Sequence, residues 1–354
     1  MARPRVSRRV VLSAVAVLLS AVTVAAASAA PDGVFPGVAS QRFIGYAQQT
    51  TTLLNRDSCG SVAFGNNPST GNPRVLWTCR DTQGLSGKEK LGSGFVSSTA
   101  SWTDVTNWGQ KAKTSNPSNT NPQQPVGPLY QGSNVPNITQ YGAVLNQGSF
   151  YPPGPNECGS TGFCSDGTRY ALWPNQPPAV THTGSDGSVR AWTFVPNSHF
   201  NGLASVGPPV TIALYRVTYT PTSTTGVNDM PTVTLMAESF WDTSKEPQYG
   251  ADGTLVGASG NYLFLYGASD TGISLARVPV ASVSDKTQYS YWIDSTQSWS
   301  STNPGRNGAS TSIPNLQAQY QGTFYWSAAW GVYVWIGQAL MRWRDHSSAL
   351  EYSF

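Results

Sequence analysis

Residues 254–266 read TLVGASGNYLFLY, an apolar run, a Ser-Gly-Asn turn and a second run of apolar and aromatic residues. β-Branched and aromatic residues bounded by glycine and asparagine favour two antiparallel strands joined by a tight turn. We therefore predict a β-hairpin that pairs residues 254–258 with residues 262–266.

The same pattern recurs along the chain and predicts three more hairpins. Three or four antiparallel strands per unit, repeated, are typical of the blades of a β-propeller, and a β-sandwich is the structural alternative. The predicted fold class is therefore all-β. The other hairpins pair 58–64 with 74–80, 179–183 with 189–195, and 323–327 with 331–336, and further strands are expected at 211–219, 232–237, 273–278 and 288–292.

The N-terminus has the order of a secretory signal: basic residues, an apolar run and small residues. Four arginines precede the apolar stretch 10–22, and Ala27, Ser28 and Ala29 follow it. An apolar run of 13 residues is short of the ~20 that span a bilayer, which makes a membrane anchor the weaker alternative. We predict cleavage after Ala29 and a secreted, extracellular protein without a membrane segment.

Composition bounds the partners of the secreted chain. Charged residues make up 11% of the sequence, and the signal contains four of the 21 basic residues and none of the 18 acidic ones. A nearly neutral mature chain without a basic run is a poor match for nucleic acid. We expect a monomer that does not bind nucleic acid.

Four cysteines in an exported chain predict two disulfides, for which three pairings exist. Cys158 and Cys164 enclose five residues and are expected to close a loop, which leaves Cys59 and Cys79 to each other. A zinc site is the rival interpretation, but no paired C-x-x-C spacing is present and the chain has only three histidines.

Five phrases carry a resemblance to a known group of proteins. Together they resemble secreted glycosidase-like five-bladed β-propellers, a broad group that contains uncharacterised families alongside arabinan-cleaving enzymes, and the resemblance covers roughly residues 40–345. It implies a five-bladed propeller that acts on carbohydrate, with a polysaccharide or an oligosaccharide as its partner. The phrases are NRDSCG at 55–60, LWTCRDT at 76–82, EPQYG at 246–250, YLFLYG at 262–267 and LARVP at 275–279.

The chain departs from this pattern because it shows four hairpin units rather than five. We expect a single β-propeller-like domain over residues 30–354, with a long loop at about 108–178 that is rich in Asn, Pro, Gln and Ser. A fifth blade would have to come from the segment before Asn55, from that long stretch, or from residues that the chain lacks. We therefore expect a propeller of the five-bladed type for which the sequence shows only four blades.

Strand register brings two carboxylates together in the first hairpin. A register with Phe64 opposite Arg74 places Cys59 opposite Cys79 and, two residues further, Asp57 opposite Asp81. Directly opposed residues have Cβ atoms ~4.5–5.5 Å apart, so the two carboxyl groups are expected to meet. Glycoside hydrolysis requires such a pair, one group to protonate the leaving oxygen and one to act as nucleophile or to activate water.

Propeller geometry adds candidates, because the loops that enter innermost strands and leave second strands share one face. On this basis Asp57, Asp81 and Glu246 are the catalytic candidates. The expected substrate-binding residues donate hydrogen bonds, carry charge or stack on sugar rings: Arg56, Arg80, His199, Tyr249, Trp173, Trp241 and Asp270.

Plainer roles remain open for all of these residues. An Asp in Arg-Asp-Thr or Arg-Asp-Ser often bonds its own backbone in a turn. Glu246 could form only a surface ion pair with Lys245, His199 could be a simple loop residue, and the tryptophans could pack in the core. We predict no cofactor and no metal site. Ca²⁺ near the carboxylates would find oxygen ligands, but no ligand series specifies it.

The leading hypothesis is a secreted glycoside hydrolase that acts on extracellular polysaccharide through paired carboxylates. One alternative is a non-catalytic carbohydrate-binding or adhesion protein on the same scaffold. Another is a polysaccharide lyase that uses His199 or a tyrosine as its base.

Overall fold

The structure is a computed structural model of the chain. It describes residues 54–66, 71, 73–85, 91–104, 149–159, 162–202, 204–206, 211–221, 231–270, 272–306, 311–314, 318–327 and 332–339. All of these lie in the larger of two compact units, 43–354. The predicted signal 1–29 and much of the predicted loop 108–178 lie outside the described residues. Within the described part, no helix is long and apolar enough to cross a membrane.

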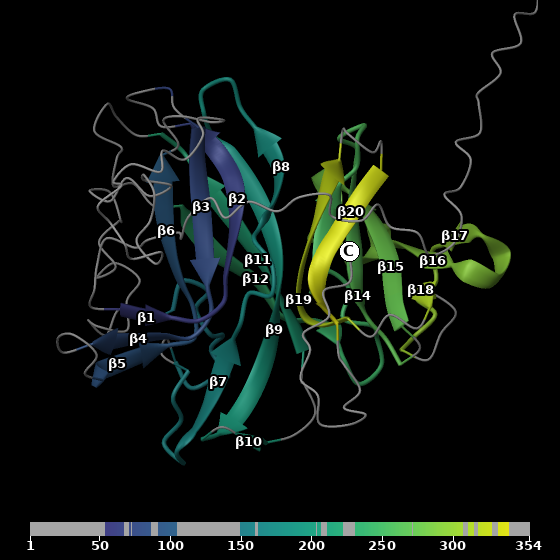
Figure 1. Cartoon of the computed structure of the whole chain (residues 1–354). Helices are drawn as coiled ribbons and strands as arrows, with labels where there is room; N and C mark the ends of the chain where they lie inside the picture. The colour runs from purple at the N-terminus through teal and green to yellow at the C-terminus, as the bar shows by residue number, and fades with distance from the viewer. Residues whose placement is uncertain are drawn as a thin grey trace, which may run out of the picture. The chain divides into compact units, whose positions relative to one another are not determined.

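The described residues form antiparallel β-sheets and no α-helix (Figure 1). The first sheet has the order β2-β3-β6, and a small sheet beside it in sequence has the order β1-β4-β5. Their bounds are β1 Leu54–Arg56, β2 Cys59–Asn66, β3 Pro73–Cys79, β4 Thr82–Leu85, β5 Leu91–Val96 and β6 Thr99–Asp104.

A middle sheet and a late sheet follow, and then a terminal hairpin. In the middle sheet β9 pairs with β7, β8, β10 and β11, and β11 pairs with β12. Its strands are β7 Thr168–Leu172, β8 Ala179–Thr183, β9 Val189–Asn201, β10 Ala204–Ser205, β11 Thr211–Tyr219 and β12 Thr232–Asp242.

The late sheet has the order β13-β14-β15-β16-β17, with β18 also paired to β15, and β19 pairs with β20 in the terminal hairpin. Three short 3-10 helices lie between its later strands. The bounds are β13 Gly253–Val256, β14 Tyr262–Ala268, β15 Gly272–Pro279, η5 Val280–Ser282, η6 Lys286–Gln288, β16 Ser290–Ile293, η7 Asp294–Thr296, β17 Ser298–Ser300, β18 Thr311–Pro314, β19 Ala318–Ser327 and β20 Val332–Ala339.

The all-β prediction is confirmed. The four predicted hairpins are β2–β3, β8–β9, β13–β14 and β19–β20, each paired antiparallel. The two further strand pairs are β11–β12 and β15–β16. One strand, β7, lies inside the stretch that we expected to be loop, because it pairs with the extended C-terminal half of β9. Local pattern could not show that long-range pairing.

Two apolar cores lie on opposite faces of the middle sheet. In β9, Trp192 and Phe194 pack toward the late sheet, whereas Ala191 and Val195 pack toward the first sheet. Successive side chains of a strand alternate between faces, so a strand that is covered on both faces must be apolar throughout. Five consecutive residues of β9 are therefore buried, 191–195.

The first strands of the four hairpins lie next to one another in chain order. β8 contacts both β2 and β13, and β13 contacts β19. Gly253 shows why a small residue is required: a Cβ atom there would lie 2.4 Å from the ring of Phe324 in β19. At the start of β2, a Cβ atom on Gly60 would lie 3.0 Å from the side chain of Pro177, just before β8.

Both predicted disulfides are present, Cys59–Cys79 and Cys158–Cys164. Cys59 pairs with Cys79 across β2 and β3 in the predicted register. The ladder is irregular between Ala63 and Asn66, so the register does not extend to the Phe64–Arg74 pair from which we derived it. The disulfides are compatible with an exported protein.

Candidate functional site

Asp57 and Asp81 are joined through the backbone, whereas the sequence analysis predicted that their carboxyl groups meet. The N–H of Asp57 donates to the carbonyl of Asp81 at 2.9 Å, and the N–H of Arg80 donates to the carbonyl of Asp57 at 2.9 Å. Between Asp57 and the strand β2, Ser58 has a φ of 42°, a left-handed conformation that bends the chain. The bend lets β1 pair with β4 while β2 pairs with β3.

The two carboxylates have different surroundings. Asp57 is exposed and accepts a hydrogen bond from its neighbour Ser58 at 2.9 Å. Asp81 is bound by Arg169 of β7, whose two terminal nitrogens donate at 3.1 and 2.9 Å, and by the indole N–H of Trp173 at 2.7 Å. Asp81 is therefore held in place by three donors, whereas Asp57 faces solvent.

Arg80 lies at the centre of this region. Burial lowers the pKa of its guanidinium to about 10, and the charges of Asp57, Asp81 and Asp252 oppose that shift. Its Nη2 donates to the side-chain oxygen of Asn175, and its guanidinium lies 5.8 Å from the ring centre of Trp173. We call Arg80, Asp57, Asp81, Asp252, Asn175, Trp173 and Arg169 the Arg80 cluster.

Asp252 is a residue of this cluster that the sequence analysis missed. It directly precedes β13, as Asp57 lies just before β2, and it is 3% exposed. Its Oδ2 accepts the backbone N–H of Ala268 at 2.6 Å. Its position immediately before an apolar hairpin strand is a signal that could have identified it as a candidate site residue. The sequence analysis instead predicts Glu246, six residues earlier, as a catalytic residue.

Gln176 joins the entrances of two strands. Its Nε2 donates to the carbonyl of Gly250, and its Oε1 accepts from the hydroxyl of Thr254 at 3.1 Å. Because Gln176 precedes β8 and Thr254 belongs to β13, this side chain fixes the start of β8 against the start of β13. The entrances of β2, β8 and β13 therefore lie together, and the Arg80 cluster is built on them.

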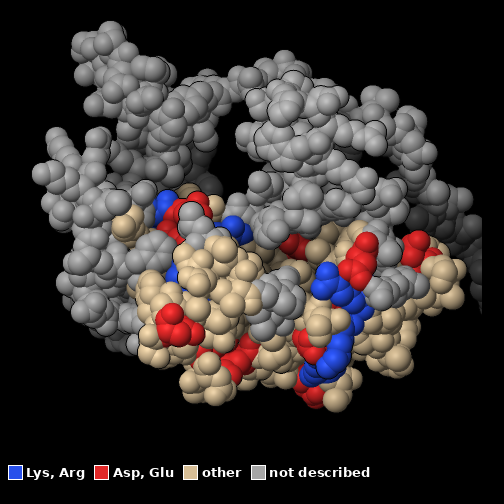
Figure 2. Space-filling model, turned by 90° about the horizontal axis from the view of Figure 1, so that it is seen from below, with Lys and Arg blue, Asp and Glu red and all other residues tan. Residues whose placement is uncertain are grey.

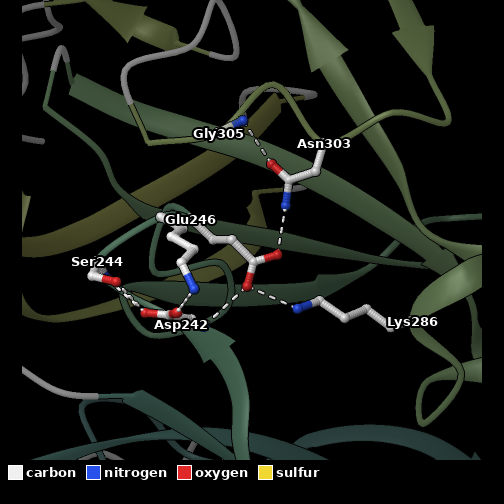
Figure 3. A network of polar contacts seen from close by, with 7 residues as sticks. Asp242, Ser244, Glu246, Lys286, Asn303 and Gly305 are labelled. Carbon is white, nitrogen blue, oxygen red and sulfur yellow. Dashed lines mark hydrogen bonds and ion pairs between the residues drawn. The ribbon is translucent and has the colours of Figure 1, made fainter.

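Glu246 belongs to a different group of charges, which Figure 3 shows. Its Oε2 pairs with Lys286 at 2.8 Å and accepts the N–H of Asp242 at 3.0 Å, while its Oε1 accepts from Asn303 at 3.0 Å. Burial, with the Glu246 charge as a smaller cause, raises the pKa of Tyr291. The predicted alternative partner Lys245 pairs with Asp242 instead, at 2.9 Å.

Asp270 lies beside this second group and pairs with Arg306 at 2.5 Å. Together with Lys245, Arg306 and others, Asp270 lines an open depression. On the face shown in Figure 2, basic and acidic side chains of the described residues lie beside one another rather than in large areas of one sign. The depression is lined by Ser244, Lys245, Asp270, Pro304, Gly305 and Arg306.

His199 and Arg56, two further predicted binding residues, form contacts with neighbouring strands. His199 stacks on Tyr170, with ring centres 4.3 Å apart, and its Nε2 hydrogen-bonds the hydroxyl of Thr168 at 2.8 Å. Arg169 pairs with Phe200 and Tyr170 with His199, so alternation puts His199 on the opposite face of this ladder from Arg169. Arg56 donates to the hydroxyl of Ser101 at 2.9 Å.

Two aromatic predictions need correction. Trp241 and Tyr249 are both fully buried, with ring centres 5.4 Å apart, in the core between the middle and late sheets. Neither offers a ring face to a sugar. Trp173 is partly exposed, but its indole N–H is directed at Asp81.

Among the described residues, no three His, Cys, Asp or Glu side chains gather as a metal site would require. No protein-family model matches the chain, and no curated protein matches it by sequence. The geometry of the Arg80 cluster is therefore the basis on which a function can be proposed.

Proposed function

We propose that the protein is a secreted carbohydrate-active enzyme, a glycoside hydrolase of the five-bladed propeller type that acts on extracellular polysaccharide at the Arg80 cluster. The observation that carries the proposal is the position of three acidic residues beside one partly buried arginine: Asp57 and Asp81 are joined through the backbone next to Arg80, and Asp252 is near enough for its charge to act on that guanidinium. These residues reach the cluster from the entrances of β2 and β13 and from the end of β3.

Sheet order supports the propeller part of the proposal. Successive sheets of a propeller place their first strands side by side around a common axis. The first strands of the four hairpins follow that order: β2 contacts β8, β8 contacts β13 and β13 contacts β19. In the middle sheet β7 precedes β8 in the chain and pairs with the C-terminal half of β9. A β-sandwich would also bury apolar faces between sheets, but it does not require each sheet to present its first strand to the first strand of the next.

The surroundings of the carboxylates suggest how they share the chemistry. Asp57 is exposed and can reach a substrate or a water molecule, and Asp252 lies almost out of solvent beside Arg80. Paired carboxyl groups in unlike environments are the basis of acid and base roles in glycosidases. Asp81 accepts hydrogen bonds from Arg169 and Trp173 and acts as a positioning residue that fixes the Trp173 ring beside Arg80.

The proposal is tested by incubating the purified mature protein with plant, fungal and bacterial polysaccharides while new reducing ends and ultraviolet absorbance are measured. We expect new reducing ends without absorbance. Asp57→Asn should lower the rate at least about 100-fold, because it removes an ionised general base or nucleophile and keeps the shape of the side chain.

Asp186→Asn is the matched control. Asp186 is exposed in the turn that follows β8, at the other end of that strand from the cluster. Its rate should equal that of the wild type. Full activity of Asp57→Asn would remove Asp57 from the mechanism, ultraviolet-absorbing products would indicate a lyase, and sugar binding without turnover would indicate a carbohydrate-binding protein.

A further inference from the structure

A second feature lies on the late sheet, away from the core that the sheet shares with the middle sheet. Leu263, Leu265 and Ala276 point into that core. Their neighbours in sequence point to the other face, where β16 and β17 extend the sheet beyond β15 (Figure 1). This face carries Tyr262, Phe264, Arg277, Trp292 and Trp299, all partly exposed, which we call the Arg277 platform.

Arg277 packs against two aromatic rings. Its guanidinium carbon lies 4.7 Å from the ring centre of Tyr262 and 4.1 Å from that of Trp299. Trp292 is paired with Trp299 across β16 and β17 and supports it edge-on, with ring centres 5.4 Å apart. Phe264 packs against Trp299 at 6.1 Å. Tyr262 and Trp299 therefore both lie within cation–π distance of the Arg277 guanidinium, and Trp292 and Phe264 support the Trp299 ring.

Arg277 is partly exposed and has no acidic partner among the described residues. The Nε atom of Arg277 is buried without a hydrogen-bond partner, whereas its two Nη atoms are not among the buried, unpartnered atoms. No ion pair between described side chains includes Arg277. The platform therefore combines aromatic rings that restrict the position of the guanidinium with a positive charge that has no acidic partner in the described part of the chain.

This geometry matches a carboxylate. A guanidinium binds a carboxylate through two parallel N–H···O bonds in the plane of the group, and a fork that is already immobilised loses little freedom when it binds. Partly exposed tryptophan and tyrosine rings add flat apolar surface of the kind that covers the C–H face of a sugar ring.

We propose that the Arg277 platform binds acidic polysaccharide, with a uronate carboxylate on the Nη edge of Arg277 and the adjoining sugar against Trp292 and Trp299. The platform is distinct from the Arg80 cluster. It would hold the protein on a uronate-containing polymer whether or not the cluster is catalytic.

The experiment is a calorimetric titration of the mature protein with a short oligogalacturonate and with its methyl ester, which lacks the charge. We expect the ester to bind at least about tenfold more weakly, since a charge-assisted bidentate contact is lost. Arg277→Gln should weaken oligogalacturonate to the same extent. Arg277→Lys should give an intermediate affinity, because it keeps the charge and loses the fork.

Arg190→Gln is the matched control, since Arg190 is an exposed arginine of β9, and it should bind as the wild type does. Thermal unfolding followed by circular dichroism verifies that each variant is folded. Asp57→Asn should also bind normally, so failure of the hydrolase proposal leaves this result unchanged. The proposal is overturned if oligogalacturonate does not bind, if the ester binds equally well, or if Arg277→Gln leaves binding unaltered. Equal affinity for poly-glutamate would also overturn it and would assign the platform to acidic peptides.

Discussion

Replacing Asp81 by alanine would leave a largely buried arginine without its counter-ion. Arg169 donates two hydrogen bonds to Asp81, at 3.1 and 2.9 Å, and Trp173 donates a third at 2.7 Å. The side chains of Arg169 and Asp81 are 13% and 20% exposed. Exposed ion pairs contribute about 0–1 kcal/mol to stability, and removal of one partner of a buried pair costs about 3–5 kcal/mol. The exposures place this pair near the buried limit, so we expect a loss of about 3 kcal/mol.

The assay is urea denaturation followed by far-ultraviolet circular dichroism, on Asp81→Ala, Arg169→Met and the double variant. Methionine keeps much of the packing of the Arg169 stem beside Trp173 and Phe200. Because the double variant leaves no unpaired charge, it should lose less than the two single variants together, with a coupling energy of about 1.5–3 kcal/mol.

An exposed ion pair provides the control. Lys245 and Asp242 lie 2.9 Å apart with side chains 79% and 38% exposed, so Lys245→Ala should cost no more than about 1 kcal/mol. A loss for Asp81→Ala no larger than that of this control, or losses in the cycle that simply add, would show that Asp81 and Arg169 do not behave as a buried ion pair.

Three further predictions concern the core, the disulfides and pH. Trp241→Ala should cost about 3–5 kcal/mol of unfolding free energy in the same assay, because the side chain is fully buried among aromatic rings. Replacing both cysteines of the Cys59–Cys79 bridge by serine should lower the free energy of unfolding by about 3 kcal/mol. The same replacement in the Cys158–Cys164 bridge should lower it by about 2 kcal/mol, because the bridges span sequence separations of 20 and 6. Burial raises the pKa of Glu157 above its ordinary value of 4.5. Above that pH the folded state retains a proton that the unfolded state releases. The free energy of unfolding should therefore fall as pH rises toward and through the folded pKa. Glu157→Gln should flatten that fall in urea midpoints measured from about pH 4 to about pH 7.

Each of these has a result that would contradict it. A loss below about 1 kcal/mol for Trp241→Ala would mean that the ring lies at the surface. A larger loss for the short disulfide loop than for the long one would argue against chain entropy as the cause. Unchanged pH dependence in Glu157→Gln would assign that dependence to another group.

Features that depend on residues close together in the chain could be predicted from the sequence. Alternation of apolar residues and short turns predicted four hairpins, and the pairing register predicted Cys59 opposite Cys79 and the approach of Asp57 to Asp81. These depend on the two-residue period of a strand and on short loops, both of which are visible in a linear sequence.

Which charges form pairs and which aromatic rings are buried depends on tertiary packing and could not be predicted from the sequence. Arg169 reaches Asp81 from 88 residues away, and Asp252 approaches Arg80 from another sheet. Glu246, expected in the same site, is instead paired with Lys286. Trp241 resembles a sugar-stacking residue in sequence, but two packed sheets bury it. Such contacts depend on how sheets pack face to face, and side-chain alternation within one strand carries no information about the partner sheet.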